Sequence, residues 1–216
     1  MALLHRADLH PAKLDLLAGW LPGRPWYQGR AGAELMRVAA CRFDDPAGAV
    51  GIETMLVAAG DGVIYQVPLT YRGTPMAGGD GWLVGTAGHS VLGQRWVYDA
   101  CGDPAYAAAL ASAILAGTGQ AEEFFETDGR LERREPSMTV TVSGRRAAAD
   151  VPAVGQVRRV VDNDPTIIVT DPVELTIVRR LDSGIRVPGA MLTGTWSGQP
   201  TPVPLAYATA RSRSRH

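Results

Sequence analysis

Alternating hydrophobic and polar positions predict that most of this chain forms β-strands. The clearest segment is Thr166 to Leu181 (TIIVTDPVELTIVRRL), in which two β-branched runs flank the dipeptide Asp171-Pro172. A strand, a tight turn and a second strand, that is a β-hairpin, are typical of this pattern. Arg179 and Arg180 end the second strand. Side chains of that strand alternate between two faces, with Val173, Leu175 and Ile177 on one face and Glu174, Thr176 and Val178 on the other.

Several other segments show the same alternation and lie between turn residues. Gly60-Asp61-Gly62 predicts a hairpin turn, and Ser197 to Pro202 predicts another. Pro68 has no backbone N–H, so its strand should lie at a sheet edge or contain a bulge there. The predicted strands are Glu34 to Phe43, Val50 to Ala59, Val63 to Arg72, Ser137 to Ser143, Val157 to Val161, Ala190 to Trp196 and Val203 to Thr209.

Two segments have helical periodicity instead. Lys13 to Leu21 places its leucines and Trp20 at helical spacing and is stopped by Pro22-Gly23. A second helix begins with Asp103 as N-cap and Pro104 in the first turn, and Gly117 is its natural end. The sequence therefore predicts an α+β fold of mostly antiparallel, curved sheets with two helices.

Composition and charge exclude several classes of protein. A formal net charge of -1 argues against general nucleic-acid binding. The two cysteines, Cys41 and Cys101, have neither the spacing of a metal site nor that of a disulfide framework, and we expect two buried thiols. No signal peptide is visible, and the longest apolar run, Ala105 to Ala116, is too short to span a bilayer. A cytoplasmic protein without membrane contact is the expectation.

Four motifs resemble one family. The segment Asn163 to Gly184 resembles the first hairpin of the kinase lobe in actinobacterial maltokinases. Near the N-terminus, Trp20-Leu21-Pro22, Trp26-Tyr27 and Gly29-Arg30 match the family's W-L-P-x-x-x-W-[FY]-x-G-[KR] segment. The cap domain of the family also contains segments similar to YQVPL at 65–69 and HSVLGQRWVYDA at 89–100.

The resemblance implies a fold and a division of the chain. Maltokinases phosphorylate maltose with ATP and have an aminoglycoside-phosphotransferase-like fold. By analogy, residues 1–150 would form a cap-like domain and residues 151–210 the antiparallel strands of the kinase upper lobe. Residues 211–216 (RSRSRH) would be a disordered basic tail.

The catalytic residues of that family have no counterparts here. Its hairpin carries a lysine that holds the ATP phosphates, and the position aligned with it is Thr176, which has no charge. Asp182 is the last acidic residue, so no catalytic base or magnesium ligand follows it. We therefore expect a non-catalytic protein without cofactor or metal. It would be an interaction or regulatory module linked to α-glucan or trehalose metabolism.

Two alternatives remain open. The chain could bind a small ligand, either a sugar or a nucleotide, on rings gathered in an open groove, or it could be one half of a split sugar kinase. A homodimer or an enzyme of the α-glucan or trehalose pathway is the expected partner. The last two predicted strands would either form the interface or bury each other. The candidate binding or interface residues are Trp26, Tyr27, His89, Trp96, Tyr98, Arg179, Arg180, Trp196 and Tyr207, and Trp82 is a further ring that could line a groove.

Overall fold

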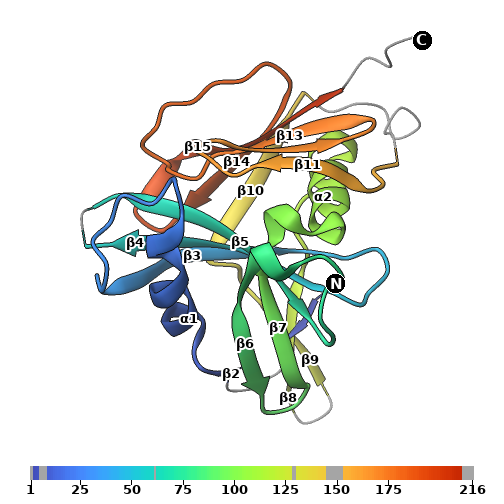
Figure 1. The fold of residues 1–216 in the computed structure, drawn as a ribbon. Coiled ribbons are helices and arrows are strands. Elements are labelled where there is room, and N and C mark those ends of the chain that lie inside the picture. The colour runs from blue at the N-terminus through green and yellow to red at the C-terminus, as the bar shows by residue number, and fades with distance from the viewer. Residues whose placement is uncertain (1, 5–8, 61, 128–129, 145–152, 211–216) are drawn as a thin grey trace.

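The computed structural model describes residues 2–4, 9–60, 62–127, 130–144 and 153–210. The tail 211–216 lies outside the described residues. Antiparallel strands dominate and two α-helices accompany them, which confirms the α+β prediction (Figure 1). Neither α-helix within the described ranges is long and apolar enough to cross a membrane.

The first large sheet has six strands in the order β2-β6-β7-β5-β4-β3. Helix α1 (Lys13–Trp20) and the 3-10 turn η1 (Leu21–Gly23) precede its main strands, and residues 90–92 turn the chain between β6 and β7. The segment HSVLGQRWVYDA therefore contains a hairpin turn, which the sequence motif did not indicate. The strands are β2 (Leu9–His10), β3 (Leu35–Phe43), β4 (Gly51–Ala59), β5 (Ile64–Arg72), β6 (Leu83–His89) and β7 (Gly93–Asp99).

The second large sheet also has six strands, in the order β10-β14-β15-β13-β12-β11. The predicted hairpin is confirmed, because β12 and β13 pair antiparallel through Ile168 opposite Leu175. Strand β10 comes from the chain before residue 150, so this sheet includes a strand from the region assigned to the cap. The strands are β10 (Met138–Ser143), β11 (Val157–Val161), β12 (Thr166–Thr170), β13 (Val173–Ile177), β14 (Ala190–Trp196) and β15 (Gln199–Ala210).

Helix α2 (Pro104–Ala111) lies between the two large sheets. Asp103 accepts a hydrogen bond from the Ala105 amide, as an N-cap does, and the helix continues into a π-helical turn, η4 (Ser112–Ala116). Gly117 ends it in the left-handed conformation at φ 71°. Both ends of this helix confirm the prediction from sequence.

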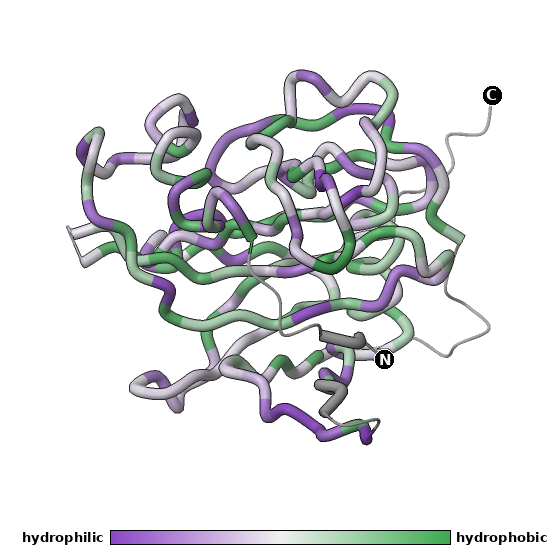
Figure 2. The backbone as a smooth tube through the Cα atoms, turned by 90° about the horizontal axis from the view of Figure 1, so that it is seen from below, coloured by the Kyte–Doolittle hydropathy of each residue, from purple (hydrophilic) through white to green (hydrophobic). Residues whose placement is uncertain are grey.

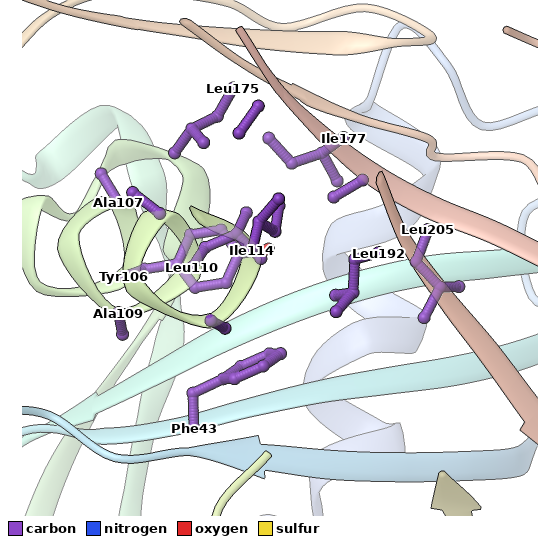
Figure 3. Close-up of a cluster of buried hydrophobic side chains, with 14 of the residues drawn as sticks. Phe43, Tyr106, Ala107, Ala109, Leu110, Ile114, Leu175, Ile177, Leu192 and Leu205 are labelled. Atoms are coloured by element: carbon purple, nitrogen blue, oxygen red, sulfur yellow. The ribbon is translucent and has the colours of Figure 1, made fainter. Parts of the chain in front are cut away.

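The main hydrophobic core surrounds α2. Figure 3 shows its side chains between Phe43 of the first sheet and a group from the second sheet. Hydrophobic stretches of the backbone run along the strands that contribute to this interior (Figure 2). The two sheets thus share one core, whose members in Figure 3 include Tyr106, Leu110, Ile114, Leu175, Ile177, Leu192 and Leu205.

A small sheet and two 3-10 turns are the other elements of the described residues. A small sheet has the order β1-β8-β9, in which β1 (Ala2–Leu4) runs parallel to β8 (Glu123–Thr127) and β9 (Arg130–Arg134) follows β8 as a hairpin. The 3-10 turns η2 (Asp80–Trp82) and η3 (Ala100–Gly102) lie on either side of the β6–β7 hairpin.

The last two strands bury part of each other's surface within the second sheet. Leu192 of β14 and Leu205 of β15 are buried in the core. Tyr207 lies on the opposite face, and its hydroxyl donates to the Ile185 carbonyl at 2.9 Å. Residues 178–189 connect β13 to β14 and rise above the sheet on the side away from α2 (Figure 1). This loop therefore covers part of the sheet's outer face.

Candidate functional site: the junction between the two sheets

Arg179 lies at the junction of the two sheets, fully buried. It directly follows the hairpin, and its Nη2 is 2.7 Å from Oδ2 of Asp99 at the end of β7. Nε donates to the Thr166 hydroxyl at 2.7 Å. Both Arg179 and Asp99 have 0% of their side-chain surface exposed. The structure thus contains a buried ion pair between residues that are 80 positions apart.

The charge on Arg179 is stabilised by its surroundings. Burial by itself lowers the pKa of a guanidinium, but the attraction of Asp99 outweighs it and raises the pKa of Arg179 above its ordinary value. Arg179 also lies over the ring of Trp26, with its Cζ 4.5 Å from the ring centroid. The Arg179 side chain therefore stays cationic, and Asp99, Thr166 and the Trp26 ring fix its position. Its other terminal nitrogen, Nη1, has no hydrogen-bond partner among the described residues.

Trp26 is the aromatic centre of the same junction. Its side chain is 2% exposed, and Nε1 donates to Oδ1 of Asp162 at 2.8 Å. The Trp20 ring meets it edge to face at 5.9 Å between centroids, and the Tyr65 ring lies 6.3 Å away. Tyr27 packs on Tyr65 at 5.0 Å. The tryptophan motif of the sequence thus forms a packed cluster.

Strand β5 is shared by the two sheets. Its second half pairs with β7 from Leu69 onward. Its first half pairs instead with the chain after β13, because the Gln66 amide donates to the Arg179 carbonyl at 2.7 Å and the Leu181 amide to the Ile64 carbonyl at 3.0 Å. Pro68 lies where one neighbour gives way to the other, so the proline interrupts no bond to β7. The prediction that this strand lies at a sheet edge or is bulged at Pro68 is nevertheless wrong, because β5 lies between β7 and β4 and its ladder with β4 shows no register shift.

The other candidate rings do not gather in one groove. Tyr98 is buried, and its hydroxyl accepts a hydrogen bond from the Met76 amide at 2.9 Å. Trp96 of β7 is half-buried between Thr86 and Arg72 on its neighbouring strands. Trp82 packs against the main core. Nδ1 of His89 accepts from the amides of Val91 and Leu92, so this histidine holds a hairpin turn.

Thr176 lies on the outer face of the second sheet. It is 5% exposed, and its direct neighbours on the adjacent strands are Ile167 and Tyr207. Arg180 pairs with Asp182 at 3.0 Å. Neither arginine that follows the hairpin is therefore available to take the place of a lysine at position 176.

A second buried charge cluster, which the sequence pattern did not predict, surrounds Glu53. This carboxylate is 3% exposed and lies 2.5 Å from Nζ of Lys13, the only lysine in the chain. The Tyr71 hydroxyl donates to it at 2.8 Å, and Arg42 is 3.7 Å away. A lone acid inside the apolar run GIETMLVAA was the available signal. The cluster ties α1 to the first sheet.

The Glu53 cluster predicts acid sensitivity. Burial raises the pKa of Glu53, but Lys13, Arg42 and the hydrogen bonds from Lys13 and Tyr71 lower it to about 2. Because this pKa is below the unfolded value, the carboxylate stabilises the fold above about pH 4.5, and that stabilisation is lost as the pH falls toward 2.

Glu53→Gln should therefore flatten the stability curve between about pH 4.5 and pH 2. Chemical denaturation at a series of pH values measures this, with the exposed Asp80→Asn as control. If Glu53→Gln and the unchanged protein lose stability in parallel over that range, Glu53 is not the responsible group.

Another acid fixes the start of α2. Asp103 has no exposed side-chain surface and receives both Nε and Nη2 of Arg72 at 2.7 Å, besides the Thr70 hydroxyl at 2.8 Å. Such bidentate geometry is characteristic of arginine. The helix N-cap is thus held on β5. Among the described residues, no three His, Cys, Asp or Glu side chains are grouped as metal ligands would be.

Comparison with known proteins agrees with these motifs. Residues 20–103 match the family model of the maltokinase N-terminal cap domain. No curated protein sequence matches the chain significantly. A solved structure, "Glucosamine kinase in complex with glucosamine, ADP and inorganic phosphate", superposes with a TM-score of 0.51 at 14% identity over 94% of this chain. This chain corresponds to 42% of the length of that kinase. Residues 20–103 are therefore similar to the maltokinase N-terminal cap domain, and the chain has a fold similar to that of part of a glucosamine kinase.

Proposed function

We propose that this chain acts as a non-catalytic interaction or regulatory module related to the maltokinase cap and upper lobe. The observation that carries the proposal is Thr176. It occupies the position that the resemblance aligns with the phosphate-binding lysine, and phosphoryl transfer needs a cation there. Arg179 is held by Asp99 and Arg180 by Asp182, so neither neighbour replaces that charge.

A kinase assay tests this proposal. The purified chain, incubated with maltose and MgATP, should yield no phosphorylated maltose above the level of a protein-free control, as measured by mass spectrometry. Thr176→Ala should give the same result. Phosphorylated maltose that appears with the unchanged chain and falls with Thr176→Ala would contradict the proposal.

The expected binding surface is the β14–β15 hairpin of the second sheet. Trp196 is half-buried at the end of β14, where it also packs against the main core, and Met191 and Val203 on the same hairpin are half-buried too. Partly covered aromatic and aliphatic side chains of this kind are typical of interface anchors. A second copy of the chain, or an enzyme of α-glucan or trehalose metabolism, is the partner we propose.

Light scattering tests the homodimer. We expect a dimer that Trp196→Glu splits, because a carboxylate buried in an interface without a partner is costly. Tyr207→Glu is unsuitable, since Tyr207 is 3% exposed and the change would disturb the fold. Met36→Glu, at a position 60% exposed on the first sheet, is the control. A monomer at all concentrations, unaffected by either change, argues against self-association.

A further inference from the structure

A group of basic side chains lies on the face of the first sheet that α1 covers (Figure 1). Arg42 stands directly opposite Glu53 in the β3–β4 ladder, and Lys13 of α1 bonds the same carboxylate. The side chain of Lys13 is 30% exposed and that of Arg42 is 20% exposed. Arg37, earlier on β3, is exposed as well. All three cations therefore reach the solvent. We call them the basic face.

A β-bulge gives Arg37 its place on the basic face. The register of the β3–β4 ladder shifts by one residue at Val38, so that Arg37 stands opposite Val57 while Arg42 stands opposite Glu53. The two partners are four residues apart on β4 and therefore on one face of the sheet. In a regular strand, two residues that are five positions apart would point to opposite faces. Bulges commonly redirect a side chain in this way.

The basic face carries more positive than negative charge. Glu53 has one negative charge and bonds Lys13, whereas Nη2 of Arg42 is 3.7 Å from it, beyond hydrogen-bond distance. Arg37 has no ion pair or hydrogen bond among the described residues, and Asp15, the acid on α1, bonds the backbone at the helix start. Burial lowers the pKa of Lys13, Glu53 offsets part of this effect, and Arg42 and Arg37 lower the pKa further. Glu53 therefore leaves both arginines available to an external anion.

We infer that the basic face binds an acidic, extended segment of a partner protein. Arg37 and Arg42 stand four ladder positions apart, which is about 13 Å at about 3.3 Å per residue. Two carboxylates about four residues apart on an extended segment match this separation, and arginine pairs well with carboxylates. The basic face belongs to the first sheet and the β14–β15 hairpin to the second. The inference therefore goes beyond the proposed function and does not depend on it.

Fluorescence anisotropy with two labelled peptides tests the inference. An oligoglutamate and an oligoglutamine of equal length differ in charge but not in backbone. The whole chain should bind the oligoglutamate at low salt and should not bind the oligoglutamine. Binding should weaken as the salt concentration rises to about 1 M, where charges more than about 3 Å apart are screened. Inorganic phosphate, added at constant ionic strength, should displace no more peptide than chloride does.

Two variants connect binding to the basic face. Arg37→Gln should weaken oligoglutamate binding about two- to fivefold, the range expected for one exposed ion pair. Because Arg37 is exposed, this change should leave the fold intact. The double variant Met36→Arg/Arg37→Met keeps the net charge but moves the cation to the opposite face of β3, since neighbouring residues on a strand alternate. It should bind as weakly as Arg37→Gln.

A matched control comes from the other large sheet. Arg159→Gln also removes an exposed arginine from an edge strand, β11, and should leave binding unchanged. The inference is overturned if the oligoglutamate does not bind, or if Arg159→Gln weakens binding as much as Arg37→Gln. It is also overturned if the double variant binds like the unchanged chain. Displacement by inorganic phosphate at constant ionic strength would instead assign the basic face to small anions.

Discussion

Replacing Arg179 by methionine should lower the free energy of unfolding by about 3–5 kcal/mol, because the change leaves Asp99 as an unpaired buried carboxylate. Methionine keeps much of the side-chain volume, so the loss reports on charge more than on packing. The stacking on Trp26 and the bond to Thr166 are lost as well. Urea denaturation monitored by circular dichroism measures the effect.

Two comparisons isolate the contribution of the buried Arg179–Asp99 ion pair to the free energy of unfolding. Arg158→Met removes an exposed arginine whose partner, Asp171, is also exposed, and it should leave the denaturation midpoint unchanged. The double variant Asp99→Leu/Arg179→Met should be more stable than Arg179→Met alone, since no unpaired charge remains. If Arg179→Met unfolds at the same urea concentration as the unchanged chain, the ion pair does not hold the sheets together.

Trp26→Ala is expected to cost about 3–5 kcal/mol, as truncation of a buried tryptophan generally does. This is a large part of the 5–15 kcal/mol that stabilises a typical domain. For a chain of this size, each kcal/mol lowers the melting temperature by about 2–4 °C. The ring contacts Trp20 and Tyr65 and bonds Asp162, so the empty space would adjoin both sheets.

A graded series separates the contributions of Trp26. Trp26→Phe keeps an aromatic ring but removes the donor to Asp162, so it should be less destabilising than alanine. Trp196→Ala, at a half-buried position, is the control and should melt above Trp26→Ala. An unchanged melting curve for Trp26→Ala would mean that Trp26 is exposed in solution and belongs among the binding residues.

Local sequence signals predicted those elements whose structure is determined within one short segment of the chain. The N-cap Asp103, Pro104 and the final Gly117 bound the α2–η4 helix as predicted, since each acts within one helical turn. The hairpin around Asp171-Pro172 formed for the same reason, because its β-branched arms need only each other and a turn.

Strand β15 is longer than predicted at its start. The sequence predicted a turn from Ser197 to Pro202 and a strand from Val203, yet the strand begins at Gln199. Two register shifts in the β14–β15 ladder accompany this stretch, and bulges of that kind accommodate residues that cannot donate a backbone bond. Strands β8 and β9 were missed because the charged run around Arg133 does not alternate with hydrophobic residues.

The buried ion pairs of the site could not be predicted, because each joins residues that are far apart in the sequence. Arg179 was expected at the end of a strand, as one of an arginine pair, but Asp99 lies 80 residues earlier and no spacing rule connects them. Glu53 depends in the same way on Lys13, 40 residues before it. The choice between an exposed and a buried charge is made by the tertiary partner, which a local pattern does not specify.

The shared strand β5 has a consequence for how this cap could be inherited. The family match ends at residue 103, yet the backbone amide of Gln66 and Oδ2 of Asp99, both inside it, bond Arg179 beyond it. Excised at that point, the cap would carry an uncompensated buried carboxylate and an open strand edge. Recombination between genes could therefore move the cap-like segment to a new protein only together with the β12–β13 hairpin and Arg179. The segment that must be inherited together is thus longer than the segment that the family model matches.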